Sequence, residues 1–445
     1  MARSSVFLRM FAVKVFAACA VTTIGFQPAL AEKPAPEVLV NWYKMALELT
    51  RHTATYTPPV ASRTFAYMGV AAFEAAASGD PKLKSLSGQL NGLTPVPERE
   101  AGAVYDEAAI LQGVMATLVP ALYANTGPTG QRVMASAEAK WRDAVATNVP
   151  EEVVTRSLDY GQAVAAHILE WSRSDGGAEV ANMGFPMEYT LKDGPANWKP
   201  TNAIPLQQKP LLPNWGTNRT FAMKNGADCP LPPPPAYSEE PTSDFFKEAK
   251  EVMETKKNLT PEQRGTARFW SDDPMLSPTP PGHWVSIALQ IIERDKTDIA
   301  KSTEVLAKLG VTLADAFIAN WQVKYQYNLL RPVTYIRQTI DKTWESAMIT
   351  PPFPEYPSGH STQSAAAALV LTDLFGANFA FEDATHVRDG IKARQYPSFM
   401  AAAEEAGISR LYGGIHFRSG IERGLDQGAC VGEFAAQLQT RNLGQ

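Results

Sequence analysis

Residues 357–375 have the sequence PSGHSTQSAAAALVLTDLF, which joins a short polar turn to an apolar helix. The turn has the composition of an anion-binding site, because Gly359 lets backbone N–H groups approach an oxyanion and a helix N-terminus attracts negative charge. Ser358 adds a hydroxyl donor, and His360 lies where it could transfer a proton. Taken alone, the same pattern would also suit a plain helix cap with an incidental histidine.

Two further motifs add cations on either side of this turn. Lys324 and Arg331 are seven residues apart, and seven residues make two helical turns, so we expect both on one helical face before Pro332 ends or kinks the helix. The segment SRLYGGIH at 409–416 contributes Arg410 and a second histidine. Each motif alone fits a solvated surface, but together they suit a tetrahedral oxyanion that carries two or three negative charges.

The composition excludes several other kinds of protein. The chain has 445 residues, and its net charge of −5 gives no sign of the basic surface that nucleic-acid binding requires. Three cysteines are too few for a disulfide scaffold or a Cys-rich zinc module. The sequence also shows no carboxylate cluster for magnesium, no Gly-rich nucleotide loop and no zinc ligand set.

The first 31 residues have the pattern of a secretory signal peptide. Arg3 and Arg9 give a positive start, residues 10–26 are mostly apolar, and Ala29-Leu30-Ala31 is a cleavage pattern. We therefore expect segment 1–31 to be removed and the protein to be exported, either to the periplasm or as a secreted protein.

The mature chain is predicted to carry no membrane span, because its longest apolar run is only residues 365–371. Two cysteines remain in it, Cys229 and Cys430. They could pair in an oxidising compartment, and the sequence leaves that open. It also leaves the oligomeric state open.

The mature chain is predicted to be all-α, since no convincing strand alternation appears. A capping box at Thr260–Gln263 marks one helix start. Apolar residues recur at helical spacing in segments 38–49, 61–77, 101–123, 132–147, 150–174, 285–293, 303–327, 359–375, 398–406 and 415–439.

A proline-rich stretch divides these helices. We expect 32–182 to form an N-terminal helical half, 183–242 an ordered connection, and 243–445 a C-terminal half that carries the site. An ordered connection is favoured because it contains large apolar side chains that require burial. They are Trp198, Leu211, Leu212, Trp215, Phe221 and Met223.

The three motifs together resemble the signature of a superfamily. It unites type 2 phosphatidic-acid phosphatases (PAP2), bacterial non-specific acid phosphatases and vanadium-dependent haloperoxidases, and its pattern is K-x6-R-P, P-S-G-H and S-R-x5-H-x3-D. The resemblance is strong over 321–420 and looser before it. The final position departs from the pattern: Gly420 stands where an Asp orients the histidine. Glu422 lies on the wrong helical face to replace it, and a backbone carbonyl could serve instead.

Further residues resemble the haloperoxidase branch. Trp321 and Phe353 stand where aromatic residues line the halide pocket of fungal vanadium chloroperoxidases, and the run 353–360 looks like theirs apart from Glu355. The segment ending at Asp273 resembles one whose final Asp pairs with an active-site arginine. This resemblance implies two packed helical bundles of the vanadium chloroperoxidase/acid phosphatase type.

The resemblance also implies roles for the motif residues in a haloperoxidase. His416 would bind vanadate, and His360 would be the acid–base that acts on hydrogen peroxide, with Lys324 polarising the peroxide. Halide would be oxidised to hypohalous acid, which halogenates small organic acceptors. Asp273 would hold Arg410. The residues expected to bind the cofactor are Lys324, Arg331, Ser358, Gly359, Arg410 and His416.

Two alternatives stay open from the motifs alone. In an acid phosphatase with no cofactor, His416 would attack the phosphorus of a phosphate ester and His360 would protonate the leaving group. A non-enzymatic phosphate- or vanadate-binding protein is the third possibility. Outside the motifs, His283 and His386 show no partner in the sequence, and Asp272 is expected to be solvated.

Overall fold

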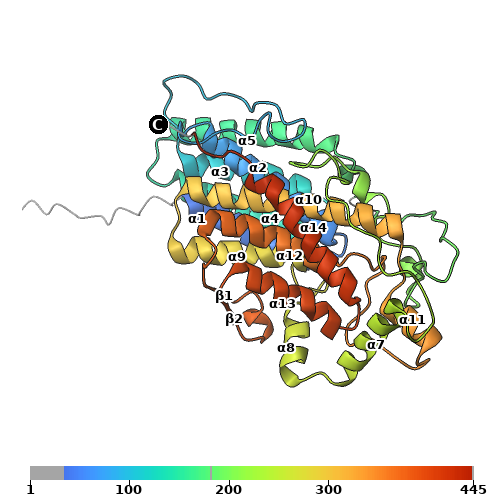
Figure 1. Cartoon of the computed structure of the whole chain (residues 1–445). Helices are drawn as coiled ribbons and strands as arrows, with labels where there is room; N and C mark the ends of the chain where they lie inside the picture. The colour runs from blue at the N-terminus through green and yellow to red at the C-terminus, as the bar shows by residue number, and fades with distance from the viewer. Residues whose placement is uncertain (1–34, 181–182, 443–445) are drawn as a thin grey trace, which may run out of the picture.

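The computed structural model describes residues 35–180 and 183–442, and this part of the chain is mostly helical (Figure 1). The predicted signal peptide lies outside the described residues. The all-α prediction is confirmed, although a small antiparallel hairpin of β1 (Phe381–Asp383) and β2 (Arg394–Tyr396) was missed. The helices are α1 (Ala35–Arg51), α2 (Pro58–Ala77), α3 (Glu107–Leu122), α4 (Pro128–Ala146), α5 (Glu151–Arg173), α6 (Gly177–Val180), α7 (Asp244–Lys257), α8 (Pro261–Phe269), α9 (Thr279–Asp295), α10 (Ile299–Tyr327), α11 (Pro332–Thr339), α12 (Gly359–Phe375), α13 (Phe399–Tyr412) and α14 (Arg418–Ala436).

Several helix boundaries differ from the predicted ones. Residues 101–106 are not helical, because Asp106 caps α3 by accepting a hydrogen bond from Ala109 N at 2.7 Å. The capping box at Thr260 is present and starts α8. Helices α6, α7 and α11 had not been predicted. Helices α6 and α11 are short, and α7 buries only Phe245, Ala249 and Val252, so each offers few apolar repeats from which a helical period can be recognised.

Helix α10 is the centre of the fold. It is buried along most of its 29 residues and packs on α2 of the N-terminal half and on α12 and α14 of the C-terminal half (Figure 1). Two glycines permit the close crossing with α2. A Cβ on Gly69 would lie 2.4 Å from Leu306 O, and one on Gly310 would lie 2.7 Å from Phe65 O. The absence of both side chains therefore sets the distance between the two helices.

A similar close approach joins α12 and α14. A Cβ on Gly428 would lie 2.1 Å from Thr362 O, and one on Gly424 would lie 2.8 Å from Ser358 O. Ser358 caps α12 by accepting a hydrogen bond from Ser361 N at 3.3 Å. Because α14 lies so close to this cap, the chain that leads into α14 at 413–417 is held beside the PSGH turn.

The proline-rich connection contains only short helical turns but is well packed. The six apolar side chains predicted to be buried are each at most 4% exposed. The carboxylate of Asp315 on α10 accepts the backbone N–H groups of Phe221, Ala222 and Met223 at 2.6–3.0 Å. One buried side chain of α10 therefore fixes a turn of a segment that has almost no regular structure.

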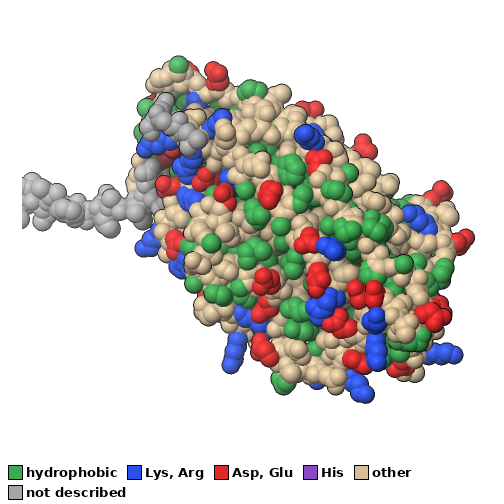
Figure 2. Space-filling view, viewed as in Figure 1, with side chains coloured by type: hydrophobic (Ala, Val, Ile, Leu, Met, Phe, Trp, Pro, Cys, Tyr) green, Lys and Arg blue, Asp and Glu red, His purple; other side chains and the backbone are tan. Residues whose placement is uncertain are grey.

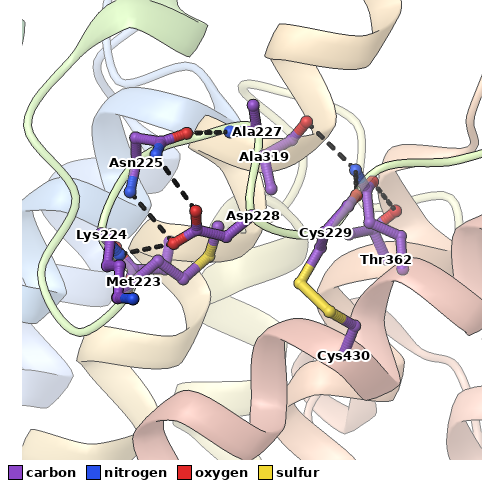
Figure 3. The surroundings of a disulfide bond; sticks show 11 residues. Met223, Lys224, Asn225, Ala227, Asp228, Cys229, Ala319, Thr362 and Cys430 are labelled. Atoms are coloured by element: carbon purple, nitrogen blue, oxygen red, sulfur yellow. Dashed lines mark hydrogen bonds between the residues drawn. A yellow bond between two sulfur atoms is a disulfide. The ribbon is translucent and has the colours of Figure 1, made fainter.

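A disulfide joins this connection to α14. Figure 3 shows Cys229 bonded to Cys430, with the turn around Asp228 beside it. The two residues are 201 positions apart, which is why the sequence could not decide whether they pair.

The largest hydrophobic core extends from Val38 to Leu438 and thus includes both predicted halves. The division at 182 and 242 stays a prediction. On the face shown in Figure 2, acidic and basic side chains are interspersed. Of the helices in the described ranges, none has the length and apolar character needed to cross a membrane.

We predict that the disulfide stabilises the fold. Replacing Cys229 and Cys430 together with serine should lower the free energy of unfolding by about 2–4 kcal/mol, because the cross-link closes a long loop in the unfolded chain. Urea unfolding monitored by circular dichroism measures this. A reducing agent should lower the stability of the wild type and leave that of the double variant unchanged. Equal stability of wild type and variant without a reducing agent would contradict the prediction.

Candidate active site

The two cations of the first motif do not share a helical face, so this prediction was wrong. Helix α10 ends at Tyr327, and Asn328 takes a left-handed conformation at φ 51°. Arg331 then becomes the N-cap of α11. The chain nevertheless turns so that both cations reach Phe353: Lys324 Nζ is 5.3 Å and Arg331 Cζ is 4.9 Å from its ring centroid.

Lys324 is fully buried and uses its ammonium protons on backbone carbonyls. It donates to Pro354 O at 3.0 Å, to Glu355 O at 2.9 Å and to Pro357 O. Burial, followed by the nearby Arg331, holds the pKa of Lys324 well below its ordinary value. An anion bound beside it would counter both effects. In this arrangement Lys324 fixes the loop before α12 and supplies positive charge.

Arg331 and His416 are in direct contact. Arg331 Nη1 lies 3.0 Å from His416 Nε2 and also donates to Ile415 O at 3.0 Å. A guanidinium can only donate, so Nε2 of His416 accepts and its proton is assigned to Nδ1. Burial and the neighbouring Arg331 keep the pKa of His416 well below its ordinary value, so the ring is neutral.

Glu355 accepts a hydrogen bond from His416 Nδ1–H and had been missed as a site residue. Its Oε1 is 2.7 Å from His416 Nδ1 and 3.0 Å from Phe417 N. The suggestion that a backbone carbonyl replaces the missing Asp was therefore wrong. Burial raises the pKa of Glu355 to about 7, against the lowering effect of Lys324 and Arg331. The sequence contained a signal for this contact, because Glu355 and Gly420 both depart from the family pattern. The two are 65 positions apart, so the sequence did not connect them.

The PSGH turn is adjacent to this pair. The Ser358 backbone N–H donates to Gly420 O at 2.8 Å. Gly359 and His360 are the first residues of α12, where backbone N–H groups have no partner within the helix. A Cβ on Gly359 would have no neighbour closer than 3.7 Å. The turn thus presents N–H groups beside an unobstructed glycine.

His360 and Arg410 lie on the other side of the site. Arg410 donates to Trp270 O at 2.7 Å, and no ion pair among the described residues joins it to Asp273. Asp273 acts on Arg410 only through its charge, which partly offsets the lowering of the Arg410 pKa to about 10 by burial. Burial, then Arg410, lowers the pKa of His360 to about 4, so its ring is neutral.

Three buried nitrogen atoms of the motif residues have no hydrogen-bond partner in the part of the chain that the structure describes. They are Arg331 Nη2, Arg410 Nε and His360 Nε2. Leaving such atoms unpaired in a protein interior costs about 1–3 kcal/mol each. The motif residues were predicted to surround an oxyanion, and unpaired cationic N–H groups beside a neutral histidine are what an oxyanion with several negative charges would satisfy.

The two aromatic residues predicted to line a pocket contact each other. The ring centroids of Trp321 and Phe353 are 5.0 Å apart. Trp321 is 1% exposed, and its indole N–H donates to Leu211 O at 3.3 Å, in the proline-rich connection. Lys324 lies near both rings. The structure therefore places these aromatics next to the cations of the first motif.

A buried network behind His360 contradicts the expectation that its members lack partners. His283 Nδ1 is 3.0 Å from Asp272, and its Nε2 is 2.8 Å from Asp383. His386 Nε2 is 3.2 Å from Asp272, whose other oxygen is 3.8 Å from His360 Nε2. Asp272 is 2% exposed. The sequence missed the network because its residues come from four separate segments.

The ligand atoms of Asp272, His283 and His386 lie within 4.8 Å of one another, close enough for a metal ion. Each nitrogen of His283 already faces a carboxylate, however, and the two Asp charges raise the pKa of His283 to about 10 despite burial. A protonated His283 between two carboxylates is a closed ion-pair network. We therefore interpret the cluster as structural support for His360.

The profile of a family described as VCPO second helical-bundle domain matches residues 304–445. A solved structure described as the first bacterial vanadium-dependent iodoperoxidase is 37% identical, with a TM-score of 0.84, and the match covers 93% of this chain and 100% of the other.

Two structures of a bacterial vanadium-dependent chloroperoxidase share the fold at lower identity. The holo form is 16% identical with a TM-score of 0.64, covering 93% of this chain and 94% of the other. The apo form is 15% identical with a TM-score of 0.62, covering 92% of this chain and 95% of the other. A comparison with curated protein sequences finds no match.

We predict that His283→Leu destabilises the protein by about 3–5 kcal/mol, because Asp272 and Asp383 would stay buried without their cation. The His283 pKa is raised in the folded state, so its contribution is complete below the unfolded pKa of about 6.5 and is lost as the pH rises through about 10. The pKa values of Asp272 and Asp383 are lowered, so their contribution is lost in acid.

Denaturant unfolding of wild type and variant at several pH values measures this difference in stability. It should be largest between about pH 4 and 6.5 and should shrink toward pH 10. His52→Leu is the matched control, because the His52 side chain is 66% exposed. A stability difference that does not depend on pH would show that His283 acts only through packing.

Proposed function

The chain belongs to the vanadium-dependent haloperoxidases, and from that membership we propose that it oxidises iodide with hydrogen peroxide in a site that binds vanadate. The observation that carries the proposal is the set of unpaired atoms Arg331 Nη2, Arg410 Nε and His360 Nε2 around the neutral ring of His416. Iodide is chosen because the relative at 37% identity is described as an iodoperoxidase and because iodide gives up electrons more readily than bromide or chloride.

The residues present fit vanadate. Because Nδ1 carries the proton, His416 Nε2 has a lone pair that could bind the metal, and Arg331 Nη1, which now donates to Nε2, would turn to the vanadate oxygens instead. Arg331, Arg410 and Lys324 would balance the charge of the oxygens, and Ser358 and the Gly359 N–H would donate hydrogen bonds. Bound here, vanadate would act as a Lewis acid toward hydrogen peroxide without changing its oxidation state.

His360 is proposed to move the proton. Its neutral Nε2 makes no hydrogen bond with the described residues and could accept a proton from hydrogen peroxide, then return it to the departing oxygen. Asp272, 3.8 Å away, would stabilise the imidazolium that forms. Lys324 contributes positive charge near Phe353 without giving up its carbonyl contacts.

Trp321 and Phe353 are proposed to form the apolar side of the halide site. Their rings exclude water and present polarisable surface, which suits a large, weakly hydrated anion such as iodide. The product would be hypohalous acid or its equivalent, which then halogenates small organic acceptors in solution.

We also propose that the protein is exported to the periplasm or secreted. The pattern of segment 1–31 supports this. So does the bond between Cys229 and Cys430, because disulfides persist in oxidising compartments.

The activity assay separates this function from a phosphatase. The purified protein loaded with orthovanadate should oxidise iodide with peroxide, with a higher kcat/KM than for bromide or chloride. His416→Ala should abolish the activity through loss of vanadate, and His360→Ala should lower kcat about 10²–10⁴-fold. His52→Ala, at an exposed site, is the control. Hydrolysis of p-nitrophenyl phosphate without vanadate-dependent halide oxidation would overturn the proposal.

The titration of His360 gives an independent prediction. In protein free of vanadate and phosphate, the His360 ring should stay neutral down to about pH 4, because burial and Arg410 disfavour the charged form. Bound orthovanadate should raise this pKa, since its negative charge counteracts the positive charge of Arg410. NMR of ¹⁵N-labelled histidine measures both values. A pKa near 6.5 in the free protein would contradict the prediction.

A further inference from the structure

Two departures from the family pattern lie against each other in space. Gly420 stands where the pattern has Asp, and Glu355 interrupts the run at 353–360 that otherwise resembles fungal chloroperoxidases. A Cβ on Gly420 would lie 2.3 Å from Glu355 Oε1 and 2.9 Å from Oε2. These distances are shorter than real Cβ contacts, so the Glu355 carboxylate occupies the space that a side chain at 420 would need.

We propose that Glu355 is the positioning residue of His416: the orienting carboxylate has moved from position 420 on α14 to position 355 in the loop before α12, and Gly420 makes room for it. The effect of Glu355 on vanadate binding rests on the function proposed above. The hydrogen bond itself can be tested without vanadate.

The contacts hold the His416 ring at both nitrogens. Glu355 Oε1 accepts a hydrogen bond from Nδ1–H at 2.7 Å, and Arg331 Nη1 donates to Nε2 at 3.0 Å. The same oxygen accepts the Phe417 backbone N–H at 3.0 Å, so the carboxylate is fixed relative to the chain that carries the ring. A hydrogen bond of this kind fixes the tautomer of a metal-binding histidine and raises its basicity.

The backbone of Glu355 is anchored as well. Its N–H donates to Leu329 O at 2.9 Å, and its carbonyl accepts from Lys324 Nζ at 2.9 Å. Glu355 is fully buried. One residue thus connects the lysine of the first motif to the histidine of the third: its backbone is held by Leu329 and Lys324, and its carboxylate by His416 and Phe417.

The other nearby carboxylate on α14 cannot take this role. Glu422 is 62% exposed, and its oxygen lies 3.8 Å from Arg418 on the helix surface. Glu422→Gln is therefore the matched control, because it removes a carboxylate two residues from Gly420 without touching His416.

The first measurement needs no vanadate. NMR of ¹⁵N-labelled histidine should show His416 as the Nδ1–H tautomer in the wild type, in Glu422→Gln and in Glu355→Gln, whose amide oxygen can still accept. In Glu355→Ala only Arg331, whose Nη1 can donate to Ile415 O instead, would still favour this tautomer, so the fraction of the Nε2–H form should rise. If Glu355→Ala leaves the tautomer unchanged, the positioning role is overturned.

The second measurement is the affinity for orthovanadate, by isothermal titration calorimetry. Glu355→Ala should bind about 10–100-fold more weakly than the wild type, as is usual when the partner of a metal-binding histidine is lost. Glu355→Gln should fall between the two, and Glu422→Gln should match the wild type. Wild-type affinity in both Glu355 variants would overturn the proposal.

The third measurement moves the carboxylate from position 355 back to position 420. Gly420→Asp alone should bind orthovanadate more weakly than the wild type, because its Cβ meets the Glu355 carboxylate. Glu355→Ala combined with Gly420→Asp should regain most of the vanadate affinity and the Nδ1–H tautomer. A folded double variant, verified by its thermal melt, that binds no better than Glu355→Ala would contradict the exchange.

The outcomes separate the two proposals. If the wild type binds no orthovanadate, the proposed function fails, while the tautomers of the Glu355 variants still decide whether Glu355 positions His416. If the double variant does not fold, the single variants decide the question: orthovanadate affinity should fall from wild type to Glu355→Gln to Glu355→Ala, and only Glu355→Ala should change the His416 tautomer.

Discussion

The neutral ring of His416, held between Glu355 on one nitrogen and Arg331 on the other, is the interaction on which the site depends. A carboxylate accepts and a guanidinium donates, so together they leave one tautomer. The same two residues connect the three motifs: Arg331 binds Phe353 O, and the Glu355 carbonyl binds Lys324. Their positions therefore determine how the lysine, the turn and the histidine face one another.

Close helix packing makes this arrangement possible. Gly69 and Gly310 let α2 lie against α10, and Gly424 and Gly428 let α14 lie against α12. A methyl group at any of these positions would meet backbone atoms and push the helices apart. The site lies where α10, α12 and α14 meet, so a shift of either helix pair would move cations relative to His416.

The site concentrates cations in an interior that disfavours them. Burial lowers the pKa values of Lys324, Arg331 and Arg410, and Glu355 is the only carboxylate within the described ranges that touches the His416 side chain. A multiply charged anion would relieve that cost and pair the free N–H groups at once. Behind His360, by contrast, His283 is balanced by two carboxylates, and that network is complete without a ligand.

The sequence by itself determined the helical class and the three motifs, because helical period and short-range turn chemistry are local properties. It assigned the motif residues to one site but missed Glu355. It also marked Trp321 and Phe353 as neighbours through the resemblance. It placed the end of α10 at Tyr327 but also suggested that Lys324 and Arg331 share a helical face, because the left-handed turn at Asn328 leaves no periodic signal. Only the tertiary structure paired Glu355 with His416, Cys229 with Cys430, and His283 with two aspartates. These contacts join residues far apart in the chain, and their partners are chosen by how the helices pack.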